Sequence, residues 1–267
     1  MAIDSDDIKV IAALVGRFEN GSEPYLGATG DFDGQGISCG VLQWNIGQGS
    51  LQPMIVKAGE AVVHATMPAF GQAMWEACTS PIPRGLAIVR GWQSNKKLLA
   101  GPRAELKALM GSPTLRQLQD DRIASVAEKA DVHARAWADA RGTAGRSKQE
   151  LAFFFDLVTQ NGSMKGLSFS DVAAFKAAVG NAKADDLICD WLAGTGSQMW
   201  GHQDAHKNAQ LWRDAVGGAE LDLLVFAYLR SQKSVLKARA DVLNRNGTIA
   251  TRRGHVHAGF YDLTELF

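Results

Sequence analysis

The sequence has no excess of positive charge. Among its 267 residues, 28 Lys and Arg residues balance 28 Asp and Glu residues. A nucleic-acid-binding protein displaces phosphate counterions with Lys and Arg, so this balance argues against that class. No apolar run approaches the ~18 residues of a membrane-spanning helix. We therefore expect neither a nucleic-acid partner nor membrane insertion.

Cysteine is scarce as well. Cys39, Cys78 and Cys189 are odd in number, lie far apart and form no Cys-x-x-Cys pair. This spacing is typical of neither a disulfide framework nor a cysteine zinc site. We expect three reduced, buried thiols.

Motifs that bind cofactors or metals are missing too. The chain has no Gly-x-Ser-x-Gly elbow, phosphate-binding loop or dinucleotide-binding glycine motif. His202 and His206 lack the intervening Glu of a zinc protease. His255 and His257 alternate and would share a strand face, but no third ligand follows at metal-binding spacing. We expect no metal and no cofactor.

Helical periodicity dominates what is present, with apolar residues at three- and four-residue steps. Ser5 is the expected N-cap of the first helix. The segments expected to be helical are 5–20, 51–58, 61–77, 114–141, 150–158, 170–179, 184–192, 206–216 and 220–243. In residues 21–49, Gly and Asp separate short apolar pieces, which predicts a small irregular β-hairpin region.

The fold class expected is therefore mostly α (α+β). We expect a single domain, 1–267, with two helical lobes, 1–141 and 147–267, joined at the Gly-rich segment Arg141–Arg146. The lobes and the β-hairpin region would flank a substrate groove.

Two carboxyl groups, one at the end of the first predicted helix and one in the β-hairpin region, have different expected surroundings. Glu19 ends an amphipathic helix, where packing can desolvate its carboxyl and raise its pKa. Asp33 follows fourteen residues later in a Gly-rich turn that would keep it ionised. Glycoside hydrolysis requires such a pair, one acid and one base or nucleophile. The alternative is a plain Asp-Gly turn and a solvated Glu. Glu23 and Asp31 compete for the two roles.

A resemblance favours catalysis. Gly40-Val41-Leu42-Gln43-Trp44-Asn45 is similar to a strand of animal-type lysozymes and to the Gly-Leu-Met-Gln phrase of lytic transglycosylases. Glu19-Asn20-Gly21-Ser22 followed by Asp33-Gly34-Gln35-Gly36-Ile37-Ser38-Cys39-Gly40 resembles family 46 glycoside hydrolases, the chitosanases. The match covers about thirty residues.

The resemblance implies a lysozyme-like fold with Glu19 as general acid and Asp33 as general base. Ser38, where the family has Thr, would help to hold the nucleophilic water. The interval between the two acids is shorter than in chitosanases, and Gln35 replaces an Arg. If the inverting chemistry of the family applies, the carboxyls should lie roughly 6.5 to 9.5 Å apart.

Sugar binding uses flat apolar faces and paired amides. The candidates for substrate binding are Tyr25, Gln43, Trp44, Asn45, Gln160 and Asn161. Trp44 could equally belong to the core. Gln160-Asn161-Gly162 could equally form a helix C-cap.

We therefore expect a muramidase that cleaves β-1,4-linked amino-sugar polymer, with peptidoglycan as its substrate, because a chitosanase cleft would show an acidic surplus. Chitosanase is the first alternative, a non-catalytic cell-wall-binding module is another, and an interaction or immunity-type protein is a third.

Acidic residues stand at the N-terminus, where a signal peptide needs basic ones. We expect synthesis in the cytoplasm and action on the cell wall after delivery by a dedicated secretion system or lysis, as for an antibacterial effector or an endolysin. The sequence does not identify a delivery or immunity partner.

Overall fold

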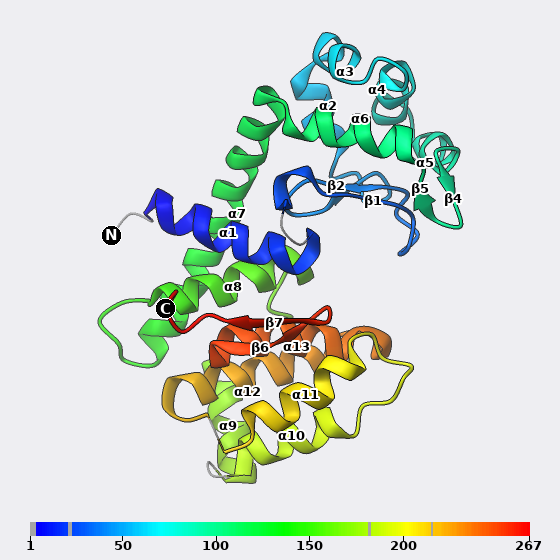
Figure 1. The fold of residues 1–267 in the computed structure, drawn as a ribbon. Helices are drawn as coiled ribbons and strands as arrows, with labels where there is room; N and C mark the ends of the chain where they lie inside the picture. The colour runs from blue at the N-terminus through cyan, green and yellow to red at the C-terminus, as the bar shows by residue number, and fades with distance from the viewer. Residues whose placement is uncertain (1–3, 21–22, 181–182, 215) are drawn as a thin grey trace. The chain divides into compact units, whose positions relative to one another are not determined.

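The computed structural model describes residues 4–20, 23–180, 183–214 and 216–267, with the side chains of Ser5, Glu19, Asn20 and Asn161 outside that description. The chain forms two compact units, residues 4–125 (the first unit) and 126–267 (the second unit). Figure 1 shows that both are built mainly from helices, as the periodicity predicts. Among the helices of the described residues, none is both long and apolar enough to cross a membrane.

The first unit begins with a helix, continues through a small sheet and ends in further helices. Its elements are α1 (Ser5–Asn20), the 3-10 helix η1 (Pro24–Leu26), β1 (Ala28–Thr29), β2 (Ser38–Cys39), β3 (Trp44–Asn45), α2 (Gln52–Ala58), α3 (Glu60–Thr66), α4 (Gly71–Thr79), α5 (Ile82–Arg90), β4 (Gln93–Ser94), β5 (Lys97–Leu98), α6 (Ala100–Gly111) and the start of α7 (Pro113–Ala140).

The β region between residues 21 and 49 is a three-stranded antiparallel sheet with β2 at its centre. Ser38 pairs with Thr29 on one side and with Asn45 on the other. Each strand has only two residues, because Gly and turn residues interrupt the chain on both sides. The predicted small, irregular β region is confirmed, as a sheet of three short strands.

α1 packs closely against this sheet region. A side-chain carbon placed on Gly16 would lie 2.6 Å from both Pro24 Cβ and Val41 Cγ2, so only glycine allows this approach. Val41 follows β2 in the turn to β3. The last turn of α1, which carries Glu19, is thus held against the small sheet.

The second unit consists of the rest of α7, further helices and a C-terminal hairpin. Its elements are α8 (Lys148–Asn161), α9 (Phe169–Val179), α10 (Ala184–Ala193), α11 (His202–Trp212), α12 (Gly218–Gln232), the 3-10 helix η3 (Leu236–Ala238), α13 (Arg239–Thr251), β6 (Arg253–Val256) and β7 (Gly259–Asp262).

Aromatic rings fill the centre of the second unit. Trp137 lies edge-to-face with Phe154 and Phe226, at centroid distances of 5.9 and 5.4 Å. Phe153 and Phe155 are fully buried on the same α8 helix. The densely apolar segment 150–158 is therefore a central buried helix, as predicted.

Several predicted boundaries are wrong, each for a local reason. The segment 61–77 is two helices, because Pro68 holds Met67 in a non-helical conformation (φ −126°, ψ 74°). The segment 220–243 is also two helices, separated by a turn and η3. Asp4 rather than Ser5 caps α1, since its Oδ1 accepts a hydrogen bond from Asp6 N at 2.9 Å.

The division between the units falls between Ser125 and Val126, within the continuous α7 helix, and not at Arg141–Arg146. The latter segment is tied into the second unit. Thr143 donates to Ala138 O from both its backbone N and its Oγ1, each at 3.0 Å. Arg141 forms an ion pair with Glu150 at 2.8 Å.

The close packing of α13 against α11 gives a stability prediction. A side-chain carbon on Gly247 would lie 2.3 Å from Cη2 of the buried Trp212 ring. We expect Gly247→Ala to lower the free energy of unfolding by about 1–3 kcal/mol, since overpacking outweighs the better helix propensity of Ala. Urea-induced unfolding measures this change.

Gly101 is the matched control, because it is exposed on α6 and a side-chain carbon there would make an ordinary 3.5 Å contact with Phe70. Gly101→Ala should raise the free energy of unfolding by about 0.5–1 kcal/mol. A stabilising Gly247→Ala substitution would contradict the packing described for α13.

Candidate functional site

The loop between β1 and β2 carries the predicted base, and a buried carboxylate anchors it. Asp31 is 8% exposed. Its Oδ1 accepts a hydrogen bond from Gly36 N at 2.7 Å, and its Oδ2 accepts one from Arg90 Nε at 2.7 Å. Burial alone would raise the pKa of Asp31, but these two partners and Lys96 outweigh burial and lower that pKa below its ordinary 3.8. Asp31 is thus an ionised structural anchor.

Gln93 holds the same loop at both ends. Its Oε1 accepts from Asp31 N at 2.8 Å, and its Nε2 donates to Gly36 O at 2.9 Å. Arg90 adds a third contact through Nη2, which donates to Gly34 O at 3.1 Å. The loop is therefore fixed from α5 and β4, which lie about sixty residues further along the chain.

Asp33 lies in this fixed loop and is exposed. Its Oδ1 accepts a hydrogen bond from Gln35 N at 3.0 Å, which closes a tight local turn. Gly34 and Gly36 have φ values of +89° and +86°, which favour glycine. Phe32, 64% exposed, stands beside Asp33. The loop thus presents a carboxylate and an aromatic ring to solvent.

The other two catalytic candidates come from neighbouring elements. Ser38 is 3% exposed on β2, directly after the loop. Glu19 lies in the last turn of α1. Because the Glu19 side chain lies outside the described residues, its pairing with Asp33 stays a prediction.

The amide and aromatic candidates of the first unit have structural partners. Trp44 is 7% exposed, which places it in the core and not on a sugar-binding surface. Asn45 is 6% exposed, and its Oδ1 accepts from Gln48 N at 2.8 Å. Tyr25 donates its hydroxyl to Asp120 Oδ1 at 2.6 Å. Gln43 accepts from Thr29 Oγ1 at 2.9 Å and donates to Gly40 O at 3.1 Å. The contacts of Gln43 and Asn45 organise the small sheet and its turns, whereas the Tyr25 contact joins η1 to α7.

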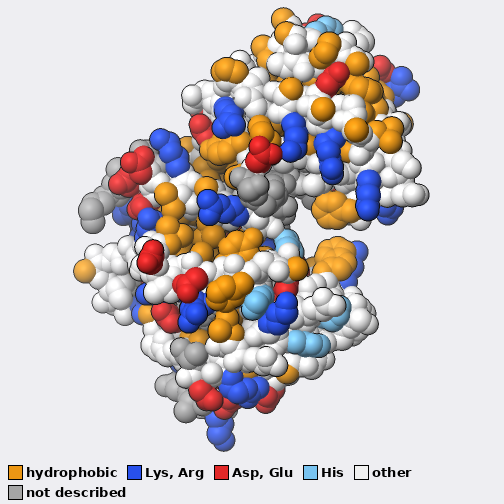
Figure 2. Space-filling view, viewed as in Figure 1, with side chains coloured by type: hydrophobic (Ala, Val, Ile, Leu, Met, Phe, Trp, Pro, Cys, Tyr) orange, Lys and Arg blue, Asp and Glu red, His pale blue; other side chains and the backbone are white. Residues whose placement is uncertain are grey.

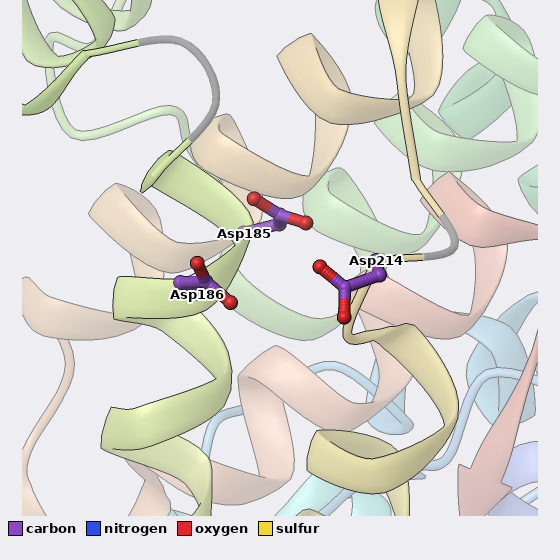
Figure 3. Close-up of side chains that lie close together, drawn as sticks. All are labelled: Asp185, Asp186 and Asp214. Atoms are coloured by element: carbon purple, nitrogen blue, oxygen red, sulfur yellow. The ribbon is translucent and has the colours of Figure 1, made fainter.

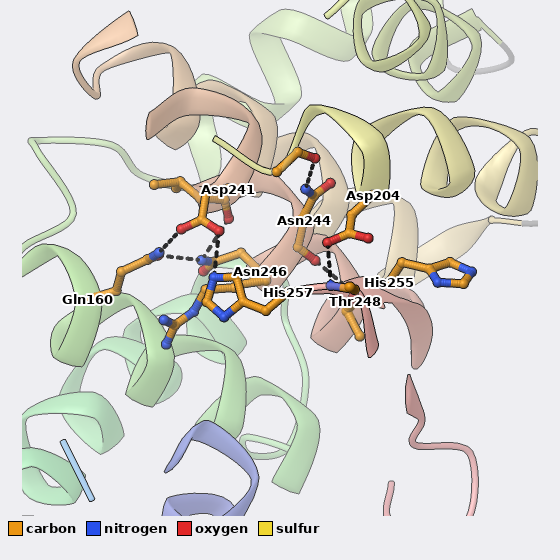
Figure 4. Close-up of polar contacts among 12 residues, drawn as sticks. Gln160, Asp204, Asp241, Asn244, Asn246, Thr248, His255 and His257 are labelled. Carbon is orange, nitrogen blue, oxygen red and sulfur yellow. Dashed lines mark hydrogen bonds and ion pairs between the residues drawn. The ribbon is translucent and has the colours of Figure 1, made fainter. Parts of the chain in front are cut away.

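Gln160 and Asn161 belong to the second unit, at the end of α8. Gly162 is left-handed (φ +68°) and its N donates to Val158 O, so the C-cap interpretation of this segment is confirmed. Gln160 Nε2 donates to Asp241 Oδ2 at 3.3 Å, as Figure 4 shows. The side chain of Asn161 lies outside the described residues.

α13 carries a row of buried polar side chains that the sequence did not reveal as a network. Asn208 of α11 donates to Asn244 Oδ1 at 3.0 Å and accepts from His255 N at 2.7 Å. Arg245 Nη2 donates to Asp156 Oδ1 at 2.6 Å, and both side chains are almost fully buried. These bonds fix α8, α11 and β6 on α13.

The two C-terminal histidines do not share a strand face. His255 lies in β6, whereas His257 is in the following turn with φ +49°. Burial lowers the pKa of His255 below 6.5, and Lys207 lowers it further. His257 Nε2 lies 2.9 Å from Asp241 Oδ1. The two rings thus have separate environments.

Within the described part of the chain, three carboxylates of the second unit come close enough to hold a cation. Oxygen atoms of Asp185, Asp186 and Asp214 lie within 4.8 Å of one another (Figure 3). Arg213 pairs with one of the three, Asp186, at 3.1 Å, and also with Asp190 outside the cluster at 2.6 Å. Acidic groups are common without a bound ion, so these three carboxylates alone do not define a metal site.

A cavity of about 250 Å³ lies at the start of α8 in the second unit. Two of its basic side chains are ion-paired, Arg141 with Glu150 at 2.8 Å and Arg252 with Glu220 at 3.2 Å. These pairs compensate part of the positive charge that lines the cavity.

The three cysteines are free and buried, as predicted. Burial raises the pKa of Cys39 and of Cys189 to about 12. Thiols with such pKa values stay protonated near neutral pH and are poor nucleophiles.

Comparisons of this chain with protein-family models, with curated proteins and with solved structures found no match. The site must therefore be argued from its own geometry.

The Asp31 anchor predicts a pH dependence of stability. Its folded-state pKa is lowered, so its contribution is present above the unfolded value of 3.8 and is lost as the pH falls through the lower folded value. We expect Asp31→Asn to lower the free energy of unfolding at pH 7 and to approach the parental value at the acid end. Urea unfolding between pH 7 and pH 2 measures both.

Asp121→Asn is the control, because it removes an exposed carboxylate 3.6 Å from Lys57 Nζ. It should stay within about 0.5 kcal/mol of the parental protein at pH 7. Parental stability of Asp31→Asn at pH 7 would show that the loop does not depend on this anchor.

Proposed function

We propose that the protein is a glycoside hydrolase with a lysozyme-like fold that cleaves β-1,4-linked amino-sugar polymer, with peptidoglycan as its substrate. Glu19 is the general acid and Asp33 the general base. The proposal is supported by the order of elements in the first unit, a helix that ends in Glu19 followed by a small antiparallel sheet.

The observation that carries the proposal is the contrast between two carboxylates two residues apart. Asp31 is buried and engaged by Arg90 and Gly36, whereas Asp33 is exposed on the loop that Asp31 anchors. A general base needs a fixed position and access to water and substrate. Asp33 combines both, which favours it over Asp31.

The acid and its surroundings support the same assignment. α1 approaches the sheet at Gly16, one turn before Glu19, so the helix end and the loop after β1 belong to one compact unit. In the proposed reaction Glu19 protonates the leaving glycosidic oxygen, and Asp33 takes a proton from the attacking water. Ser38 lies on β2 directly after this loop, and its burial disfavours a direct contact with that water. Phe32 offers an apolar face for the sugar ring.

The charge around the loop favours peptidoglycan over chitosan. Lys96 and Lys97 are exposed on the β4–β5 hairpin, and the backbone of Lys96 contacts Gly30 at the start of the loop. Figure 2 shows Lys and Arg atoms where Figure 1 has this hairpin. Peptidoglycan carries carboxylates, which these cations attract, whereas chitosan is a polycation that they repel.

Clearing of purified peptidoglycan tests the catalytic assignment. We expect Glu19→Gln and Asp33→Asn each to lower the rate of turbidity loss about 10²–10⁴-fold, since each removes a proton-transfer group. Circular dichroism should show an unchanged fold, and sedimentation of the variants with peptidoglycan should show unchanged binding.

Glu23→Gln is the matched control, because Glu23 is an exposed carboxylate paired with Lys107 at 3.1 Å. It should retain the parental rate within about twofold. Parental clearing by Glu19→Gln would exclude Glu19 as the acid. Parental clearing by Asp33→Asn together with loss in Asp31→Asn would transfer the base role to Asp31.

Mass spectrometry of the products separates the remaining alternatives. Reducing ends from peptidoglycan indicate hydrolysis, whereas anhydro sugars indicate a transglycosylase. Products from chitosan alone would identify a chitosanase. Binding without any product would identify a non-catalytic cell-wall module.

A further inference from the structure

Trp200 is an exposed aromatic ring in the segment before α11. Trp200 is one of the exposed large apolar residues of the second unit, with 49% of its surface exposed. Lys237 Nζ lies 4.6 Å from the ring centroid, a cation–π contact. The two residues are also joined through the backbone, since Trp200 N donates to Lys237 O at 2.7 Å.

The backbone next to Trp200 is held by the polar side chains of α13. Gly201 is left-handed (φ +74°), and a side-chain carbon there would lie 2.8 Å from Asn244 Nδ2 and 3.5 Å from Asp241 Cα. Asn244 Nδ2 donates to Gly201 O at 2.9 Å (Figure 4). Trp200 is therefore exposed but fixed, which lowers the entropy that ordering it would cost on binding.

Asp241, against which Gly201 packs, carries a polar cluster. Its carboxylate contacts His257 Nε2 at 2.9 Å and Gln160 Nε2 at 3.3 Å. His257 and Ala258 both have positive φ, 49° and 67°, in the turn between β6 and β7. Asp204 Oδ2 stabilises this turn by accepting from Ala258 N at 2.9 Å. The carboxylate on α13 thus contacts the imidazole in the β6–β7 turn and the amide on α8, and these contacts fix the part of α13 against which Gly201 packs.

We propose that Trp200 and Lys237 form a saccharide-binding subsite for a carboxylate-bearing amino sugar. The apolar face of a pyranose ring packs on the indole, as apolar faces pack on aromatic rings in proteins. Lys237 binds a carboxylate of the glycan or its peptide. The choice of ligand rests on the proposed function, but binding here does not require cleavage.

Binding of three oligosaccharides in the Glu19→Gln background tests the subsite. The probes are a peptidoglycan disaccharide-peptide with free carboxylates, neutral N-acetylchitotetraose and fully deacetylated chitotetraose, measured by isothermal titration calorimetry. We expect Trp200→Ala to weaken binding of the first two at least about tenfold. Lys237→Gln should weaken only the disaccharide-peptide, about fivefold or more. Deacetylated chitotetraose should bind worst of the three.

Phe260→Ala is the matched control. Phe260 is 51% exposed in the same unit and also has a cation over its ring, Arg253 at 5.9 Å. It should bind all three probes like the Glu19→Gln parent. Equal binding by Trp200→Ala, an equal loss in Phe260→Ala, or no binding of any probe to the parent would overturn the proposal.

Turnover by the protein with native Glu19 distinguishes failure of the subsite from failure of the proposed function. If the protein cleaves peptidoglycan and Trp200→Ala binds the probes as before, the proposed subsite is refuted and the proposed hydrolase function stands. If binding depends on Trp200 but the protein cleaves no peptidoglycan, the proposed hydrolase function is refuted and the proposed subsite stands.

Discussion

The ionised carboxylate of Asp31 is the interaction on which the candidate site depends. Burying a charge is costly unless it is paired and hydrogen-bonded. Asp31 meets both conditions through Arg90 and Gly36 N, and Gln93 then binds the backbone at both ends of the same loop. Because the loop contains two glycines with positive φ, it would otherwise have many accessible conformations. The anchor selects one of them and leaves Asp33 exposed.

In the second unit, polar contacts of α13 have a comparable role. Arg245 pairs with Asp156 inside the core, and Asn244 binds both Asn208 and Gly201 O. An apolar core tolerates small shifts between helices, whereas a buried network must be satisfied in one arrangement. α13 is therefore aligned with α8 and α11 by directional bonds. The segment that leads through Trp200 and Gly201 into α11 is held in the same arrangement, because Asn244 binds Gly201 O.

Elements with strong local signals could be predicted from the sequence. The helix expected over 114–141 is α7, and the apolar segment 150–158 lies within the buried helix α8. The errors at 61–77 and 220–243 arose where one apolar period continued across a break, at Pro68 and at the turn before η3. Arg90, Gln93 and Asp241 could not be predicted, because their roles depend on partners about 60 to 80 residues away. Asp33 and Ser38 could be proposed as site residues because their motif is local, and their catalytic roles stay predictions. Trp44 is buried in the core, which nothing in the motif could reveal.

Although the net charge is zero, the lysines are unevenly distributed, and their positions bear on the choice of substrate. Lys96 and Lys97 are exposed on the hairpin whose backbone approaches Gly30 in the loop of Asp33, and Lys237 Nζ lies 4.6 Å from the centroid of the Trp200 ring. A lysine over an indole both strengthens the aromatic surface and competes with any ammonium group that a ligand would place there. Under the proposed function, the carboxylates of peptidoglycan would be attracted by the lysines at both proposed sites. A polyglucosamine would be repelled by the same lysines, which is why peptidoglycan rather than chitosan is the substrate proposed.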